Sequence, residues 1–154
     1  KGMANGMPIA VYAGRKELMA AIDRGTGASV STTFGGETLS LAATKACITV
    51  YREQDVISHM WKQSEKLWTK FQQQLIQYSV PLKITGAWPC PAIVQEANAP
   101  ADTVSRMFQL AYEHGVALSH VPYTILSHQD EDIREATIRL EDACHAYQQS
   151  IDHS

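Results

Sequence analysis

A lysine stands directly before a glycine-containing turn at the start of this chain, and a hydroxyl-rich turn with two glycines follows further along. The first segment reads Lys1-Gly-Met-Ala-Asn-Gly-Met-Pro8, and the second reads Ser31-Thr-Thr-Phe-Gly-Gly-Glu-Thr38. A lysine amine can form a Schiff base with an aldehyde when its pKa is low enough to leave it unprotonated. Free N–H groups at a helix start attract phosphate, and glycines let the backbone approach it. The two segments therefore suit a phosphate-bearing aldehyde cofactor.

Both segments resemble the signatures of the class III pyridoxal-phosphate (PLP) aminotransferases, a fold-type-I family that includes glutamate-1-semialdehyde aminomutase. In that family the cofactor lysine is followed by a glycine turn, a proline and a short strand that ends in Gly-Arg, as residues 1–15 do here. The second signature, Thr-(aromatic or Leu)-(Gly or Ser)-Gly-Asn-Pro, aligns with residues 33–38, where Glu37-Thr38 replaces the commoner Asn-Pro. A weaker likeness covers residues 126–133.

This resemblance implies the roles of three residues. Lys1 would form the internal aldimine with PLP and shuttle a proton between the substrate Cα and the cofactor. Thr33 would donate its hydroxyl and N–H to the cofactor phosphate, and Thr32 is a weaker candidate for the same role. In the family this threonine reaches into the neighbouring subunit, which implies a homodimer with a shared active site. Small amino donors and carbonyl acceptors would be the substrates.

The resemblance also implies an α/β fold of fold type I, built in two parts. Residues 1–52 would be the tail of the large cofactor domain, and residues 53–154 would form a long linking helix and an α+β small domain. A complete fold-type-I enzyme needs a large domain that 154 residues cannot supply. We therefore expect a carboxy-terminal fragment that begins at the cofactor lysine and is inactive alone.

Hydrophobic periodicity and turn residues predict the elements. Strands are expected at residues 9–13, 81–87, 91–96 and 116–119, and helices at 15–22, after Gly36, from 55 to 78, from 102 to 114 and from 129 onward. The helix after Gly36 should bury a face of small residues against the large domain. The helix at 55–78 should bury an aromatic stripe and expose its polar residues, which include Gln63 and Gln74.

The composition is that of an ordinary cytoplasmic enzyme. The chain is 45% hydrophobic with a formal charge of −3, which is far from the basic balance of a nucleic-acid binder. No apolar stretch approaches the length needed to cross a bilayer. Cys47, Cys90 and Cys144 are odd in number and widely spaced, which favours free thiols over a disulfide frame or a zinc site.

Other polar residues have simpler interpretations than a catalytic role. Asp130, Glu131 and Asp132 favour the positive end of a helix dipole, so helix-start chemistry is preferred over a metal site. The stretch at 118–127 has no arginine that could bind a substrate carboxylate. This absence favours the glutamate-semialdehyde-like branch of the family. The six histidines fit no metal pattern and are expected at the surface, at helix caps or beside a loop.

Two rival functions stay open. The same lysine chemistry supports an intramolecular aminomutase, which would turn over without an added donor and acceptor. Alternatively, the chain is a non-enzymatic interaction module in which Lys1 and Thr33 are loop residues.

Overall fold

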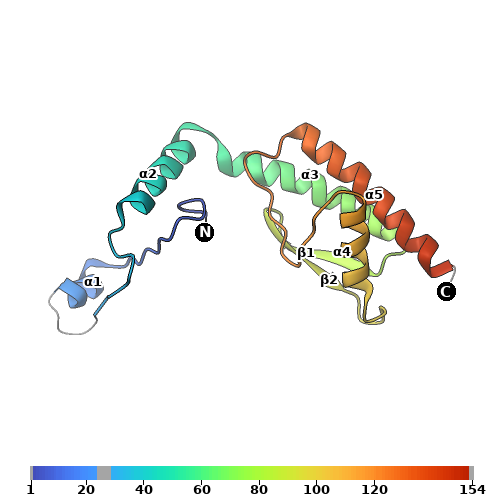
Figure 1. Cartoon of the computed structure of the whole chain (residues 1–154), viewed down its shortest axis with the longest axis horizontal. Helices are drawn as coiled ribbons and strands as arrows, with labels where there is room; N and C mark the ends of the chain where they lie inside the picture. The colour runs from blue at the N-terminus through green and yellow to red at the C-terminus, as the bar shows by residue number, and fades with distance from the viewer. Residues whose placement is uncertain (1, 24–28, 153–154) are drawn as a thin grey trace. The chain divides into compact units, whose positions relative to one another are not determined.

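The computed structural model describes residues 2–23 and 29–152, which divide into two compact units. Unit 1 is Lys1–Asp55 and unit 2 is Val56–Ser154. Figure 1 shows the helices and strands in chain order: α1 (Lys16–Asp23), α2 (Thr38–Glu53), α3 (Val56–Gln77), β1 (Leu82–Ala87), β2 (Cys90–Gln95), α4 (Thr103–Glu113) and α5 (Asp130–Asp152). Each unit is described below by itself.

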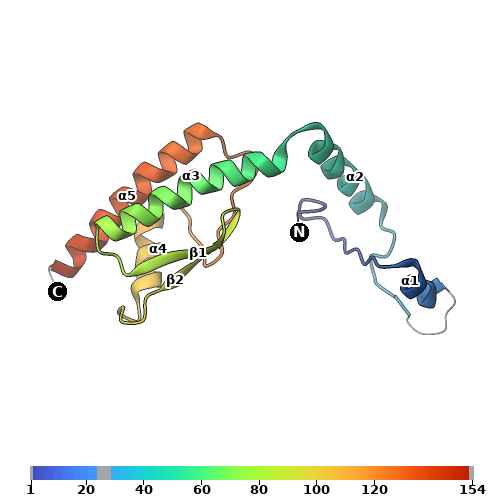
Figure 2. The ribbon, with the colours of Figure 1, turned by 180° about the vertical axis from the view of Figure 1, so that it is seen from behind.

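Unit 2 packs three helices around a β-hairpin. Figures 1 and 2 both show α3 and α5 side by side, with α4 and the hairpin on one side of them. Helix α5 contacts α3 and α4, β1 contacts α3, and β2 contacts α4. The largest apolar side chains that are fully buried come from α3, β1, α4 and α5: Phe71, Leu75, Leu82, Met107, Leu140 and Tyr147. One continuous core therefore holds unit 2 together.

Apolar periodicity located the helices of unit 2 correctly, but the stripe on α3 is buried over only part of its length. Leu67, Trp68 and Phe71 are buried, as predicted. By contrast, Ile57 is 63% exposed and Trp61 is 46% exposed, near the amino-terminal end of the helix. The continuous apolar core thus begins at Leu67, about three turns into α3.

Two glutamines of α3 were expected in solvent but are buried. Gln63 is 5% exposed and donates from Nε2 to Asp130 Oδ1 at 2.8 Å. Gln74 is 1% exposed and donates from Nε2 to the Thr137 carbonyl at 3.0 Å. Because α5 supplies a hydrogen-bond acceptor for the Nε2 group of each glutamine, both side chains can be buried.

The strands predicted at residues 81–87 and 91–96 form as β1 and β2 and pair as an antiparallel hairpin. Their register places Leu82 opposite Gln95 and Ala87 opposite Cys90. The strand predicted at residues 116–119 does not form. One backbone hydrogen bond, from the Ile93 N–H to the His120 carbonyl at 3.2 Å, links β2 to the end of that stretch. A ladder needs repeated bonds of this kind, so residues 116–119 remain irregular.

The described residues of unit 1 form two helices and long irregular segments. The strand predicted at residues 9–13 is wrong: the run is irregular and mostly exposed. The described part of unit 1 contains no strand with which it could pair. Ser40 is the one buried residue of α2, and the expected packing of its small-residue face against the large domain stays a prediction.

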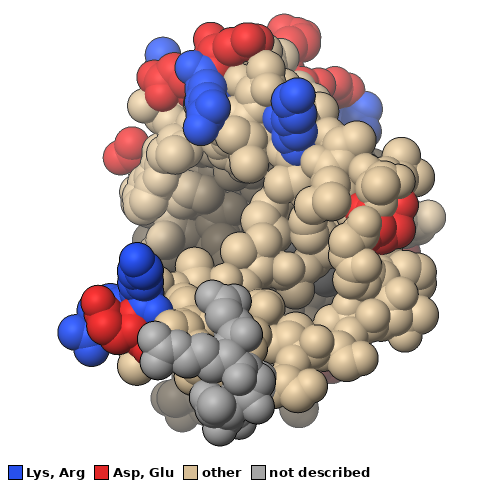
Figure 3. Space-filling model, turned by 90° about the vertical axis from the view of Figure 1, so that its left-hand side faces the viewer, with Lys and Arg blue, Asp and Glu red and all other residues tan. Residues whose placement is uncertain are grey.

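The surface of unit 1 carries many exposed apolar side chains: Val11, Tyr12, Leu18, Val30, Phe34, Leu39, Leu41, Ile48 and Tyr51. From the side drawn in Figure 3, charged side chains gather in small groups of both signs, with uncharged surface between them. Among the described residues no helix is long and apolar enough to span a membrane.

Candidate functional site: a hydroxyl-rich turn at the start of α2

Residues 32–37 form two consecutive tight turns that lead directly into α2. The Gly35 N–H donates to the Thr32 carbonyl at 3.3 Å, and the Glu37 N–H donates to the Phe34 carbonyl at 3.1 Å. Gly36 has a φ of +74°, a region that favours glycine. The side chains of Thr32 and Thr33 are exposed and have no hydrogen-bond partner among the described residues. This turn therefore offers two free hydroxyls on a fixed backbone.

The turn borders a hollow that brings together parts of both predicted signatures. The hollow has a volume of about 460 Å³ and is lined by residues 8–11, by the turn at 32–36, and by Glu37, Ser40 and Leu41. Residues 8–11 directly follow the glycine turn after Lys1. The two segments that suggested cofactor chemistry thus share one concave surface within unit 1.

The glycine turn after the lysine has the predicted tight geometry. The Met7 N–H donates to the Ala4 carbonyl at 3.1 Å, and Asn5 and Gly6 have φ values of 49° and 96°. An Asn-Gly pair is favoured where two successive residues need positive φ. Lys1 itself, the predicted catalytic residue, lies outside the described residues.

The start of α2 is capped by a carboxylate of its own chain. Glu37 Oε1 accepts from the Leu39 N–H at 2.7 Å, and Glu37 Oε2 accepts from the Ser40 N–H at 2.7 Å and from the Ser40 hydroxyl at 2.6 Å. The Ser40 hydroxyl, and then the two N–H groups, lower the pKa of Glu37 below its ordinary value of 4.5. The expectation of free N–H groups at this helix start is therefore corrected at Leu39 and Ser40.

Sequence reasoning missed this cap for a definable reason. Helix caps are most often Ser, Thr, Asp or Asn, and the longer Glu side chain is not a usual one. The available signal was the position of Glu37 directly before the helix, with the Ser40 hydroxyl three residues later.

In unit 2 the three acids at the start of α5 have structural partners, and Asp132 has the predicted helix-start role. Asp130 accepts hydrogen bonds from Gln63 and Lys66, Asp132 accepts from the Gln129 N–H, and Glu131 pairs with Arg134. Among the described residues no group of histidine, cysteine and acidic side chains could hold a metal ion.

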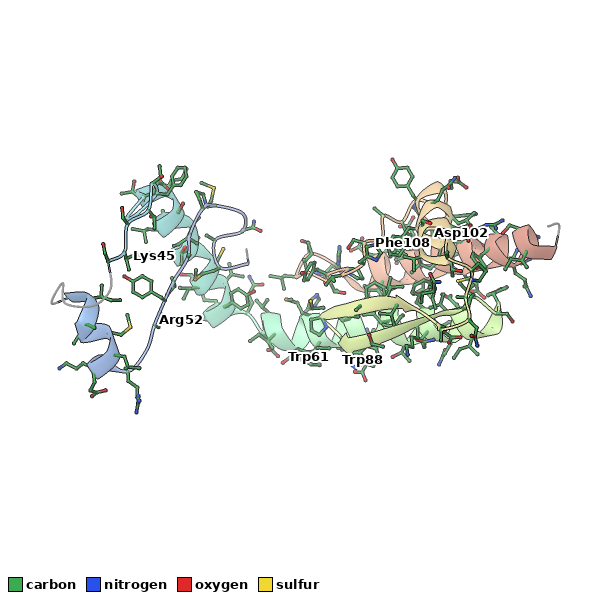
Figure 4. The ribbon with its side chains drawn as sticks, turned by 90° about the horizontal axis from the view of Figure 1, so that it is seen from below. Lys45, Arg52, Trp61, Trp88, Asp102 and Phe108 are labelled. Carbon is green, nitrogen blue, oxygen red and sulfur yellow. The ribbon has the colours of Figure 1, made fainter. Side chains whose placement is uncertain are left out.

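Two of the histidines and the other two arginines of unit 2 also have structural partners. His59 Nε2 lies 2.9 Å from the His128 carbonyl oxygen, and the His120 ring lies 5.3 Å from that of Phe108, centroid to centroid. Phe108 extends from α4 and Trp88 lies at the hairpin turn (Figure 4). Arg106 donates to the Ser150 carbonyl and Arg139 to the Gly115 carbonyl. These residues stabilise unit 2 and form no separate constellation.

Solved structures that resemble this fold are PLP-dependent transaminases. A transaminase with PLP bound matches with a TM-score of 0.83 and 19% identity, covering 100% of this chain and 38% of its own. The PLP internal aldimine form of the Sphingopyxis FumI protein matches with a TM-score of 0.72 and 18% identity, covering 84% and 32%. A β-phenylalanine aminotransferase from Variovorax paradoxus matches with a TM-score of 0.68 and 18% identity, covering 91% and 35%.

These matches define the fold as the mixed α/β fold of the PLP-dependent transaminases. The chain belongs to the class-III aminotransferase family, because the model of the family described as Aminotransferase class-III matches residues 1–144. The cofactor of this family is pyridoxal phosphate. The chain spans about a third of the length of the solved structures that it matches.

The residues around the turn fit the phosphate of that cofactor. Two hydroxyls and the N–H groups of Thr33, Phe34 and Gly36 have no partner among the described residues, and all of these residues line the hollow. Phosphate oxygens accept hydrogen bonds from such donors.

Proposed function

We propose that this chain supplies part of an enzyme that transfers an amino group between a small amino donor and an aldehyde or keto acceptor, with Lys1 as the residue that holds PLP. The family match over residues 1–144, which includes Lys1 and the hydroxyl-rich turn, carries this proposal. Because the chain spans about a third of its structural relatives, the activity is proposed for the whole enzyme. The 154 residues alone are expected to be inactive.

Each proposed residue has a defined task. Bound PLP supplies the electron sink that stabilises negative charge at the substrate Cα. Lys1 Nζ, in its unprotonated form, takes up the proton that leaves this Cα and returns it to the product. Thr33 donates its hydroxyl and N–H to the phosphate, and Thr32 is the alternative hydroxyl donor on the same turn. The turn thereby fixes the position of the phosphate and, through it, that of the reacting atoms.

Several finer features belong to the same proposal. The enzyme is a cytoplasmic homodimer in which Thr33 serves the site of the neighbouring subunit. The exposed apolar side chains of unit 1, such as Phe34 and Leu39, support burial against further protein. The absence of an arginine between residues 118 and 127 supports the glutamate-1-semialdehyde-like branch.

An aminomutase is the second candidate, since it uses the same lysine. Omitting the added donor and acceptor distinguishes the two: an aminomutase continues to turn over, whereas an aminotransferase stops. A non-enzymatic interaction module is the third and weakest candidate.

Replacing Lys1 in the intact enzyme tests the proposal. We expect Lys1→Ala to lower kcat at least ~10³-fold, because proton transfer by a positioned group and covalent attachment of the cofactor are both lost. Lys45→Ala is the matched control, since Lys45 is an exposed lysine on α2 of the same unit (Figure 4). Equal activity of the Lys1→Ala variant and the control would refute the role of Lys1.

A further inference from the structure

Glu37 ties the hydroxyl-rich turn to the first turn of α2 through both its backbone and its side chain. Its N–H donates to the Phe34 carbonyl, and its carbonyl accepts from the Leu41 N–H at 3.2 Å. Its two carboxylate oxygens accept the three hydrogen bonds from Leu39 and Ser40 described above. The residue therefore belongs to the turn and to the helix at once.

Ser40 anchors this arrangement from the helix side. It is 2% exposed, and it is the one buried residue of α2. Its carbonyl accepts a further hydrogen bond from the Thr44 hydroxyl at 2.8 Å. Because the Glu37 carboxylate reaches a buried partner, the turn cannot swing away from α2 without breaking charge-assisted hydrogen bonds.

The same arrangement decides which groups remain for an anion. The carboxylate takes the N–H groups of Leu39 and Ser40 and places a negative charge at the end of the helix that would otherwise attract phosphate. A phosphate in the hollow must therefore bind to the turn itself, through Thr33 and the neighbouring free N–H groups. Its binding then depends on how rigidly the turn is held.

We propose that Glu37 is a positioning residue that holds the turn at residues 32–36 in the geometry that binds the cofactor phosphate. The inference rests on the proposed function, and it adds a residue that does not itself touch the cofactor. It predicts a specific difference between the affinities for PLP and for pyridoxal. Loss of the Glu37 carboxylate weakens binding of PLP but leaves binding of pyridoxal, which lacks the phosphate, unchanged.

The test compares the dissociation constants of PLP and pyridoxal for the intact apoenzyme, measured by absorbance titration. We expect Glu37→Ala to weaken PLP binding about tenfold, the loss expected for about one charge-assisted hydrogen bond. Pyridoxal binding should change by less than about twofold, within the spread of neutral substitutions. Glu37→Asp restores a capping carboxylate and should recover most of the affinity for PLP. Glu53→Gln, an exposed acid at the other end of α2, is the matched control.

The possible outcomes distinguish failure of the positioning role from failure of the proposed function. An unchanged ratio of the two constants in Glu37→Ala, or tighter PLP binding after the negative charge is removed, overturns the positioning role. If the wild-type enzyme binds neither compound, the proposed function fails instead. If Glu37→Ala does not fold, Ser40→Ala decides the question, because it removes only the hydrogen bond of the Ser40 hydroxyl. That variant should lower the affinity for PLP relative to pyridoxal about threefold, and no change in the ratio refutes the inference.

Discussion

Gly115 ends α4 in a conformation that a residue with a Cβ resists, so Gly115→Ala should destabilise unit 2. Its φ is +84°. The Gly115 N–H donates to the Tyr112 carbonyl at 2.9 Å and the Val116 N–H to the Ala111 carbonyl at 2.7 Å, the two bonds of a Schellman motif. An added Cβ would also collide with Nη1 of Arg139.

Three contributions set the size of the effect. Left-handed backbone with a Cβ costs about 1.5 kcal/mol. Displacing Arg139 breaks its exposed hydrogen bond to the Gly115 carbonyl, which is 3.2 Å long, and adds about 0.5 kcal/mol. Alanine reduces the freedom of the unfolded chain, which offsets about 0.5 kcal/mol. The net loss is about 1.5 kcal/mol, or about 7 °C in Tm for a unit of this size.

Tryptophan fluorescence isolates this effect, because all three tryptophans (61, 68 and 88) lie in unit 2. Urea unfolding of the 154-residue chain, followed by this signal, should give the predicted loss. Gly36→Ala is the control: its φ is +74°, but it lies in unit 1 and an added Cβ meets nothing within 4 Å. That variant should leave the tryptophan transition unchanged.

A second variant separates backbone strain from the displacement of Arg139. In an Arg139→Ala background, Gly115→Ala should cost about 0.5 kcal/mol less than in the wild-type chain. A Gly115→Ala variant with a free energy of unfolding within about 0.5 kcal/mol of wild type would refute the reasoning.

Two further predictions concern the core of unit 2. Burial, and then the charge of Glu141, raise the pKa of the Cys144 thiol to about 12. At pH 8 that thiol is protonated, so Ellman's reagent should label exposed Cys90 in the native chain and leave Cys144 unlabelled until urea is added; equal labelling rates would contradict this. Phe71→Ala should lower the free energy of unfolding by about 3–5 kcal/mol, because Phe71 is fully buried. Ile76→Ala, at a site that is 70% exposed, should change it by less than about 0.5 kcal/mol, and similar losses in both variants would argue against the assigned core.

Local signals predicted much of unit 2. The hairpin follows from two short apolar runs around Trp88-Pro89, and the end of α4 follows from Gly115. These features depend on residues close together in sequence. The predicted strands at 9–13 and 116–119 failed because a strand needs a partner, and partners are set by distant parts of the chain.

Long-range partners also explain the errors in burial. Gln63 and Gln74 lie on α3 at positions that read as polar surface, yet α5 supplies acceptors more than sixty positions away in sequence. At the candidate site, the threonine turn was identified from its motif. The Glu37 cap was missed because glutamate is not a usual capping residue, and the side-chain geometry establishes it.

The most direct test of the account is to locate the residue that holds the cofactor. The intact enzyme, saturated with PLP, would be reduced with borohydride and digested, and the modified peptide would be sequenced by mass spectrometry. The account predicts a phosphopyridoxyl group on Nζ of Lys1. Its attachment to another lysine, such as Lys16 or Lys45, or to no lysine of this chain, would contradict the central claim.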